Sequence, residues 1–345
     1  MIARKVGSAG ILLLLMSLLL TACAYSTHTG AATPRRVEEA TYLTLGGIEQ
    51  WVTIRGADAR KPVLLVVHGG PGDILSPYRE EFAPYESEFV VVHWDQRGAG
   101  RTYGRNGAQT PEITLDRIVK DGLELAETLR TRFGRKVILL GHSWGSVVGV
   151  EMVRRRPELF AAYVGTGQVA GWVAGAHAQY EFLQRSAAAP DAEGLRAALD
   201  QMGTFDAGDA GDLRILNREI RRHLGPADTA WLGGLLERAR QVSTPQEFAD
   251  ADAGMTLSGR ALLADMRAED LFATAPRLAI AVTVIQGKQD LFTPTEAAEA
   301  WFTTLEAPRK QLVLLEDAGH FALLTHGPQM VAALKAAAVA QNPAP

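Results

Sequence analysis

Short apolar runs alternate with helix-like segments over most of the chain. Such uninterrupted runs are typical of strands buried on both faces of a sheet. The runs lie at 63–67, 89–94, 136–140, 162–165, 282–286 and 311–315. Between them, apolar positions recur with a helical period, as in residues 115–133. This pattern predicts an α/β fold with a mostly parallel central sheet flanked by helices.

Two segments depart from this alternation. Residues 42–54 alternate like the two arms of a β-hairpin. Residues 169–273 have helical spacing and no convincing strand, so we expect a helical cap inserted into the sheet domain. The segments 41–168 and 274–345 would then form one core built from two stretches of chain.

The first residues have the pattern of an export signal. Arg4 and Lys5 precede an apolar run at 11–20, and small residues follow it. A basic start, a short apolar run and small residues are typical of a secretory signal, which we expect to end at residue 22. An uncleaved membrane anchor is the alternative, because residues 6–24 carry no charge and have about the minimum length of a bilayer span.

The stretch Leu20-Thr21-Ala22-Cys23 resembles the bacterial lipoprotein box, in which the cysteine is lipidated and becomes the new N-terminus. Cys23 is the only cysteine in the chain, so no disulfide can form within it. We therefore expect residues 1–22 to be a signal peptide and 23–40 to be a lipidated, flexible tether. The protein would be an exported lipoprotein anchored in the bacterial cell envelope, in the outer membrane of a Gram-negative cell.

Composition narrows the classes of function. The chain has 345 residues, 47% of them hydrophobic, and a formal net charge of −4. This length allows a large core, and the mild acidity gives no basic footprint for nucleic acid. No histidines or acidic residues stand at metal-ligand spacing, so the sequence implies neither a metal nor another cofactor.

The stretch Gly141-His142-Ser143-Trp144-Gly145 fits the pattern G-x-S-x-G between a predicted strand and a predicted helix. A serine at such a sharp turn is held in a strained backbone conformation with its hydroxyl exposed. Glycines at 141 and 145 avoid a collision as strand and helix close up. The amide of Trp144 would lie at a helix N-terminus, ready to donate to an oxyanion.

A catalytic serine needs a base, and the base needs an orienting acid. Asp290 follows one predicted strand and His320 follows the next, so both lie where parallel strands present reactive groups. The order Ser143, Asp290, His320 matches a nucleophile, acid and base. Asp317 competes for the acid, but it sits only three residues before the histidine on the same loop.

Several motifs together resemble the prolyl aminopeptidase branch of the α/β-hydrolases. They are His68–Gly72 (HGGPG), Asp95–Thr102 (DQRGAGRT), Gly141–Ser146 (GHSWGS), Gly287–Asp290 (GKQD) and Gly319-His320. The resemblance covers about residue 41 to the C-terminus, and it implies the α/β-hydrolase fold with an inserted cap. It also implies that Gly70 and Trp144 supply the oxyanion-hole amides, and that Asp95, Arg97 and Arg101 brace the site.

Cap glutamates of this family capture the N-terminal ammonium of the substrate. The family's local contexts for them are missing from this sequence. Glu181 and Glu219 are the possible substitutes, although each also suits a solvated helix face.

The resemblance and the motifs predict a serine hydrolase that acts through an acyl-enzyme. The expected reaction is release of an N-terminal residue, such as proline, from a short peptide. A carboxylesterase of small acyl esters is the alternative enzyme. A catalytically idle surface lipoprotein that only binds a ligand is the alternative of another class. In each case the expected partners are a small peptide or ester and, through the lipid, a membrane.

Overall fold

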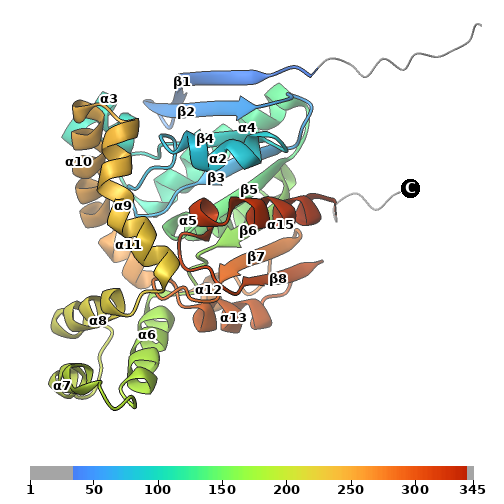
Figure 1. Ribbon diagram of the computed structural model, residues 1–345. Helices are drawn as coiled ribbons and strands as arrows, with labels where there is room; N and C mark the ends of the chain where they lie inside the picture. The colour runs from blue at the N-terminus through green and yellow to red at the C-terminus, as the bar shows by residue number, and fades with distance from the viewer. Residues whose placement is uncertain (1–33, 340–345) are drawn as a thin grey trace, which may run out of the picture. The chain divides into compact units, whose positions relative to one another are not determined.

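The computed structural model describes residues 34–339, and its eight strands form one sheet (Figure 1). The strand order is β1-β2-β4-β3-β5-β6-β7-β8. The strands are β1 (Val37–Leu45), β2 (Ile48–Gly56), β3 (Val63–Val67), β4 (Val90–Trp94), β5 (Val137–His142), β6 (Phe160–Thr166), β7 (Val282–Gly287) and β8 (Lys310–Leu315). β1 and β2 pair antiparallel, β2 pairs antiparallel with β4, and all other pairs are parallel.

Strands β3, β4, β5 and β7 are buried at every position, as their uninterrupted apolar sequences predict. Helices cover both faces. α4 (Leu115–Phe133), α5 (Trp144–Arg155) and α13 (Thr295–Thr304) contribute to the apolar core on one face. α2 (Arg79–Glu86), α14 (Ala322–Thr325) and α15 (Gly327–Val339) contribute to the core on the other. The predicted α/β fold with a mostly parallel, helix-flanked sheet is confirmed.

Seven helices lie between β6 and β7 and form the cap. They are α6 (Trp172–Ser186), α7 (Glu193–Met202), α8 (Ala210–Arg222), α9 (Pro226–Val242), α10 (Pro245–Ala261), α11 (Leu263–Ala268) and α12 (Leu271–Thr274). An isolated bridge between Gly171 and Asp270 joins the two ends of this insertion. In Figure 1 the cap helices gather at one side of the sheet, and α10 packs against the short core helix α3 (Gly100–Asn106).

The predicted hairpin is longer than its alternating pattern suggested. β1 begins at Val37 and pairs along its whole length with β2. Most of β1 between Val37 and Leu45 is exposed or half-buried, because it is the edge strand of the sheet. An edge strand packs one face only weakly, so its sequence carries a weak strand signal.

A buried ion pair fixes the loop after β4 to the core. Arg97 Nε donates to Asp121 Oδ2 at 2.8 Å, and both side chains are buried. The remaining guanidinium nitrogens donate to the carbonyl oxygens of Gly46 and Pro111. Gln50 also donates to Asp121, at 2.7 Å. The bracing role implied for Arg97 therefore has a concrete form: it ties the hairpin turn, the loop after β4 and helix α4 together.

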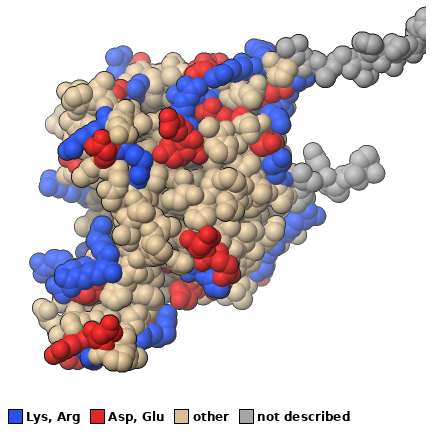
Figure 2. Space-filling view, in the orientation of Figure 1, with Lys and Arg blue, Asp and Glu red and all other residues tan. Residues whose placement is uncertain are grey.

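The molecular surface mixes charges of both signs. On the face drawn in Figure 2, blue and red side chains lie next to each other around a largely uncharged centre. Within residues 34–339, each helix is too short or too polar to cross a bilayer. The expected signal peptide 1–22 and residues 23–33 of the expected tether, including Cys23, lie outside the described residues. The expected end of the tether at residue 40 is wrong, because residues 37–40 already pair with β2 as the start of β1.

We expect Asp121→Ala to lower the free energy of unfolding by about 3–5 kcal/mol, because it leaves the Arg97 cation buried without its counter-charge. Urea unfolding followed by circular dichroism measures this. Asp116→Ala on the same helix is the matched control. Asp116 pairs with Lys120 and Arg155 but is 56% exposed, so its loss should cost under about 1 kcal/mol. Equal losses for both variants would contradict the assignment.

Candidate active site

Ser143 occupies a strained turn between β5 and α5. Its backbone has φ of +54° and ψ of −127°, one of two positive φ values at non-glycine residues in the described chain. Its amide donates to the Thr166 carbonyl at the end of β6, at 3.1 Å. The strain persists because strand, helix and neighbouring loop all fix the turn, and it turns the hydroxyl out of the sheet.

The flanking glycines are required by space. A Cβ on Gly141 would meet the Gly145 carbonyl oxygen at 2.6 Å. A Cβ on Gly145 would overlap the carbonyl oxygen of Val67, the last residue of β3. Gly69 is equally confined, since its Cβ would lie 2.8 Å from that of Ser143. The expected collision of β5 with α5 is therefore present at Gly141, whereas at Gly145 the helix would collide with the end of β3.

The structure places the side chains of Ser143 and Asp290 within hydrogen-bond distance of opposite sides of the His320 ring. Ser143 Oγ lies 3.1 Å from His320 Nε2. On the other side of the ring, His320 Nδ1 lies 2.9 Å from Asp290 Oδ2. The competing acid Asp317 is 82% exposed and points to His326 instead. This geometry suits a nucleophile, a general base and an orienting acid.

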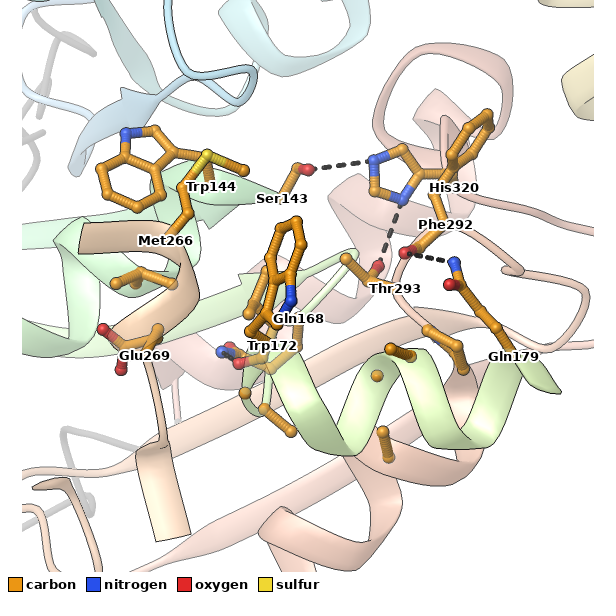
Figure 3. A pocket seen from close by; sticks show the side chains of 18 of the residues that line it. Ser143, Trp144, Gln168, Trp172, Gln179, Met266, Glu269, Phe292, Thr293 and His320 are labelled. Carbon is orange, nitrogen blue, oxygen red and sulfur yellow. Dashed lines mark hydrogen bonds between the residues drawn. The ribbon is translucent and has the colours of Figure 1, made fainter. Parts of the chain in front are cut away.

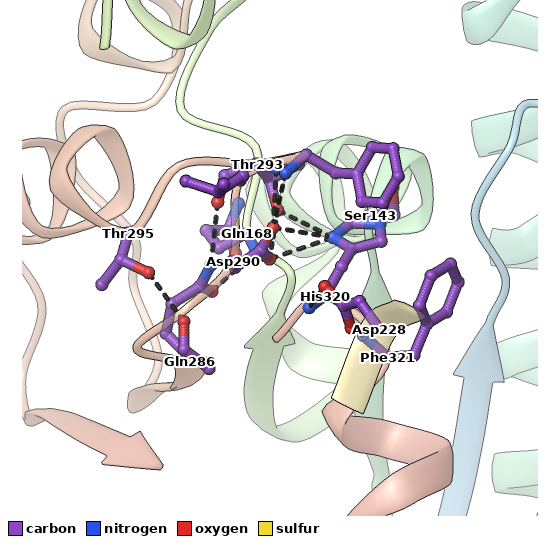
Figure 4. A network of polar contacts seen from close by, with 12 residues as sticks. Ser143, Gln168, Asp228, Gln286, Asp290, Thr293, Thr295, His320 and Phe321 are labelled. Carbon is purple, nitrogen blue, oxygen red and sulfur yellow. Dashed lines mark hydrogen bonds and ion pairs between the residues drawn. The ribbon is translucent and has the colours of Figure 1, made fainter. Parts of the chain in front are cut away.

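The Asp290 carboxylate is held by several other donors (Figure 4). Oδ1 accepts from the amides of Phe292 and Thr293, each at 2.9 Å. Oδ2 accepts from the hydroxyl of Thr293 at 2.7 Å and from Gln286 Nε2 at 3.0 Å. Burial alone would lower the pKa of His320, but the charge and hydrogen bond of Asp290 outweigh burial and raise it. The carboxylate therefore favours the imidazolium that forms when the ring takes a proton.

A second carboxylate from the cap supports the histidine loop, and sequence reasoning missed it. Asp228, in the first turn of α9, accepts from the backbone amides of His320 at 2.8 Å and Phe321 at 3.1 Å. A Cβ on Gly319 would overlap this carboxylate, so glycine is needed there. Burial raises the pKa of Asp228. Nothing in the local sequence of α9 signals this contact, because its partners lie 92 positions away.

The expected oxyanion-hole residues both line the cavity in front of Ser143. Trp144 is the first residue of α5, and the first N–H groups of a helix have no intrahelical acceptor. Gly70 has φ of +108°, which glycine adopts without strain. Two backbone amides near the serine could together stabilise a developing oxyanion.

The cavity holds about 540 Å³ and is walled by both core and cap. From the cap come Trp172, Leu213, Leu232 and Met266, which make one side apolar. Figure 3 shows Ser143 and His320 together at one end, with Met266 and Glu269 across from His320. A volume of this size, with apolar groups on one side and polar groups among the remaining lining residues, suits a small organic substrate.

The two glutamates expected to read the substrate lie elsewhere. Glu181 is exposed and faces Arg185. Glu219 is buried, but its carboxylate is occupied by Arg218 and Arg222. Neither side chain lines the cavity. Both residues sit on cap helices as expected, yet their faces turn away from Ser143.

A different glutamate faces the cavity. Glu269 is buried at the end of the cap insertion, where its carbonyl accepts from the Trp172 amide at 3.0 Å. Its Oε1 has no hydrogen-bond partner among the described residues. Burial, and then the charge of Glu151, raise the pKa of Glu269 to about 7. A buried carboxyl oxygen without a partner is unusual and suggests that a ligand group completes it.

Two further charged side chains line the cavity, Asp73 and Arg221. Burial raises the pKa of Asp73, whose Oδ1 already accepts from the Ile74 amide. Arg221 lies over the ring of Phe292. Among the described residues, no three His, Cys, Asp or Glu side chains are grouped as metal ligands would be.

Comparison with known proteins identifies the family. Residues 63–334 match the sequence model of the alpha/beta hydrolase family, so the chain belongs to that family. The chain is 28% identical over 295 residues to a probable aminopeptidase, YbaC, of Bacillus subtilis strain 168, covering 81% of this chain and 89% of the relative. A stretch of 113 residues is 35% identical to a probable proline iminopeptidase of Streptomyces coelicolor, covering 32% of this chain and 34% of the relative.

Comparison with solved structures gives the same fold. The crystal structure of a proline iminopeptidase-related protein from Thermus thermophilus superposes with a TM-score of 0.60 and 24% identity, covering 88% of this chain and 98% of that one. The predicted α/β-hydrolase fold is thereby confirmed. The chain is a hydrolase by family, and the finer question is which bond it cleaves.

We expect kcat/KM to fall at low pH with an apparent pKa above the ordinary histidine value of 6.5. His320 must be neutral to accept a proton from Ser143, and the Asp290 carboxylate raises its pKa, so protonation disables the base earlier on acidification. A pH–rate profile with an ester substrate that carries no titratable group measures this acidic limb, which is the fall of kcat/KM at low pH. In Asp290→Asn the limb should move to lower pH, and kcat should fall by orders of magnitude. A limb well below 6.5 in the parent would contradict this role for Asp290.

Proposed function

We propose that the protein is a serine aminopeptidase that releases the N-terminal residue of short peptides. Ser143 Oγ attacks the carbonyl carbon of the first residue while His320 Nε2 takes the hydroxyl proton. The amides of Gly70 and Trp144 stabilise the tetrahedral oxyanion. His320 then gives its proton to the leaving amine, and an acyl-enzyme remains on Ser143. Water hydrolyses that ester, with His320 again as the base.

The observation that carries this proposal is the unpartnered carboxyl oxygen of Glu269 in the same cavity as Ser143. An aminopeptidase must bind the free ammonium of its substrate, and a buried carboxylate with one unpartnered oxygen is the matching group. The names of the relatives, probable aminopeptidase and probable proline iminopeptidase, support the same reaction. Proline is the specific N-terminal residue that the second of these names suggests.

A carboxylesterase of small acyl esters is the second candidate. It is favoured by the raised pKa of Glu269, about 7, because near neutrality a large fraction of molecules then carries an uncharged carboxyl group. With that group neutral, the cap side of the cavity, including Trp172 and Met266, suits an apolar acyl chain. The two candidates differ in whether the substrate must carry a free amine.

The experiment compares arylamides of proline and alanine with their N-acetylated forms, in the parent and in Glu269→Gln. For the free-amine substrates we expect Glu269→Gln to raise KM by about 10- to 100-fold, the loss of a charged hydrogen bond worth about 1.5–3 kcal/mol. Glutamine keeps the size of the side chain, so kcat should change less. As pH rises through about 7 the Glu269 carboxyl ionises, and KM for the free amine should fall in the parent only.

Glu181→Gln is the matched control, since its side chain is exposed and outside the cavity. Ser143→Ala sets the zero of activity for every substrate. Equal turnover of blocked and free amines, unaffected by Glu269→Gln, would reject the aminopeptidase. Turnover confined to a short-chain aryl ester would identify the esterase instead.

We also propose that Cys23 is lipidated and anchors the protein in the bacterial cell envelope. The support is the sequence Leu20-Thr21-Ala22-Cys23 after an apolar run, with the chain's only cysteine at the position the lipoprotein box requires. Because two acyl chains suffice for stable anchoring, a lipidated Cys23 would hold the enzyme on a membrane.

Full-length parent and Cys23→Ala, expressed in a Gram-negative host and separated into membrane and soluble fractions, test the anchor. The parent should sediment with membranes and incorporate labelled palmitate, whereas Cys23→Ala should incorporate none. Ser17→Ala, within the apolar run, is the control and should behave as the parent. Labelled lipid in Cys23→Ala, or none in the parent, would refute lipidation at this residue.

A further inference from the structure

A second cavity, of about 230 Å³, is lined by none of the residues that line the active-site cavity. Its walls come from β1 and β2, the loop before α2, helix α3 and the start of α10. It therefore lies where the hairpin of the core meets the cap. Its charged lining residues are Arg55, Arg79, Arg101 and Glu247.

The positive charges of this cavity are not all balanced. Arg79 is paired with Glu38 at 2.7 Å, and Arg101 with Glu247 at 2.5 Å. Arg55, on β2, has no carboxylate within ion-pair distance in the described part of the chain. Its guanidinium is half-buried, and burial together with the charge of Arg79 lowers its pKa. The carboxylates of Glu86 and Glu38 act on Arg55 only from beyond ion-pair distance, so this guanidinium has no direct carboxylate partner in the described residues.

Neutral polar groups beside Arg55 also lack partners. Thr53, two residues earlier on β2, is only 2% exposed and lines the cavity, yet its Oγ1 forms no hydrogen bond. His93, the register partner of Thr53 on β4, has an Nδ1 without a partner. Arg55 Nε is a third such atom. Of these three residues, Thr53 and Arg55 line the cavity, whereas His93 does not. Buried polar atoms are nearly always paired, so the two unpaired atoms on the wall indicate a missing ligand.

We propose that this cavity binds a small oxyanion, a carboxylate or phosphate group, held by the guanidinium of Arg55 and the hydroxyl of Thr53. A guanidinium offers a planar fork of donors that matches two oxygens of such a group. Arg55 is the arginine left to bind it, because the other two arginines of the cavity already have direct carboxylate partners. The cavity holds only about 230 Å³, so it admits only a small group.

The position of the cavity gives the bound anion a structural role. Arg55 belongs to the core sheet, whereas Ser243 and Glu247 belong to the linker and first turn of α10 in the cap. The Arg101–Glu247 ion pair already joins these two parts. An oxyanion bound beside it would accept hydrogen bonds from Arg55 and Thr53 of the core at the same junction.

The test titrates the purified protein with sodium phosphate and, separately, sodium acetate, at constant ionic strength set with sodium chloride. Isothermal calorimetry and the melting temperature are the readouts. We expect saturable binding of at least one of the two anions in the parent, with an increase in melting temperature. Arg55→Gln should weaken that binding by at least about tenfold, and Thr53→Val should weaken it by a smaller factor. The arm that saturates identifies the group as phosphate or carboxylate.

Arg277→Gln is the matched control, because Arg277 is exposed, pairs with Glu306 and lies outside the cavity. Arg55→Gln should label with a fluorophosphonate as the parent does, since Arg55 is not part of the catalytic machinery. If Arg55→Gln fails to fold, Arg55→Lys replaces it: the charge stays, the fork is lost, and binding should still weaken. Binding of neither anion, or equal binding in Arg55→Gln and Arg277→Gln, would show that only water fills the cavity and would overturn the proposal.

Discussion

The candidate site depends on one constraint, the confinement of Ser143 at positive φ between a buried strand and a helix. Gly141 permits the close approach of β5 and α5, and Gly145 permits that of α5 and the end of β3. The surrounding sheet offsets the cost of the strained residue, which is of order 1–3 kcal/mol. The hydroxyl is thereby fixed relative to the strands that carry the acid and the base, before any substrate arrives.

Electrostatics around His320 complement that constraint. Asp290 is hydrogen-bonded to the His320 ring, and Asp228 accepts from the backbone amide of the same residue. Two carboxylates therefore favour a positive charge on this imidazole. His142, the neighbour of Ser143, contributes no opposing charge, because burial lowers its pKa to about 3. Its Nε2 lies 3.1 Å from the His320 carbonyl oxygen, which adds a second support to the loop. His320 is thus held by groups from the sheet domain, from the turn around Ser143 and from the cap.

Local sequence was sufficient for the parts of the site that are set by backbone geometry. The glycines around Ser143 and the ends of β7 and β8 indicated where Asp290 and His320 would meet it, because a parallel sheet brings such ends to one edge. Side chains that act across long sequence separations had no such signal. Asp228 and Glu269 look like ordinary helix-end acids until the cap is folded over the core. Glu219 shows the opposite case, in which a residue looks suitable in the sequence but is not in the site. Its carboxylate is paired with Arg218 and Arg222.

The hydrogen bonds from the His320 loop to α9 have a mechanical consequence. Because Asp228 belongs to the cap and its partners are backbone amides of the core, displacement of α9 would free the loop that carries the imidazole. The alignment of the imidazole therefore depends on the position of the cap. Removal of the cap would open the cavity, but it would also remove the carboxylate that holds the His320 loop. Deleting cap helices to widen the substrate range would therefore leave the base poorly aligned.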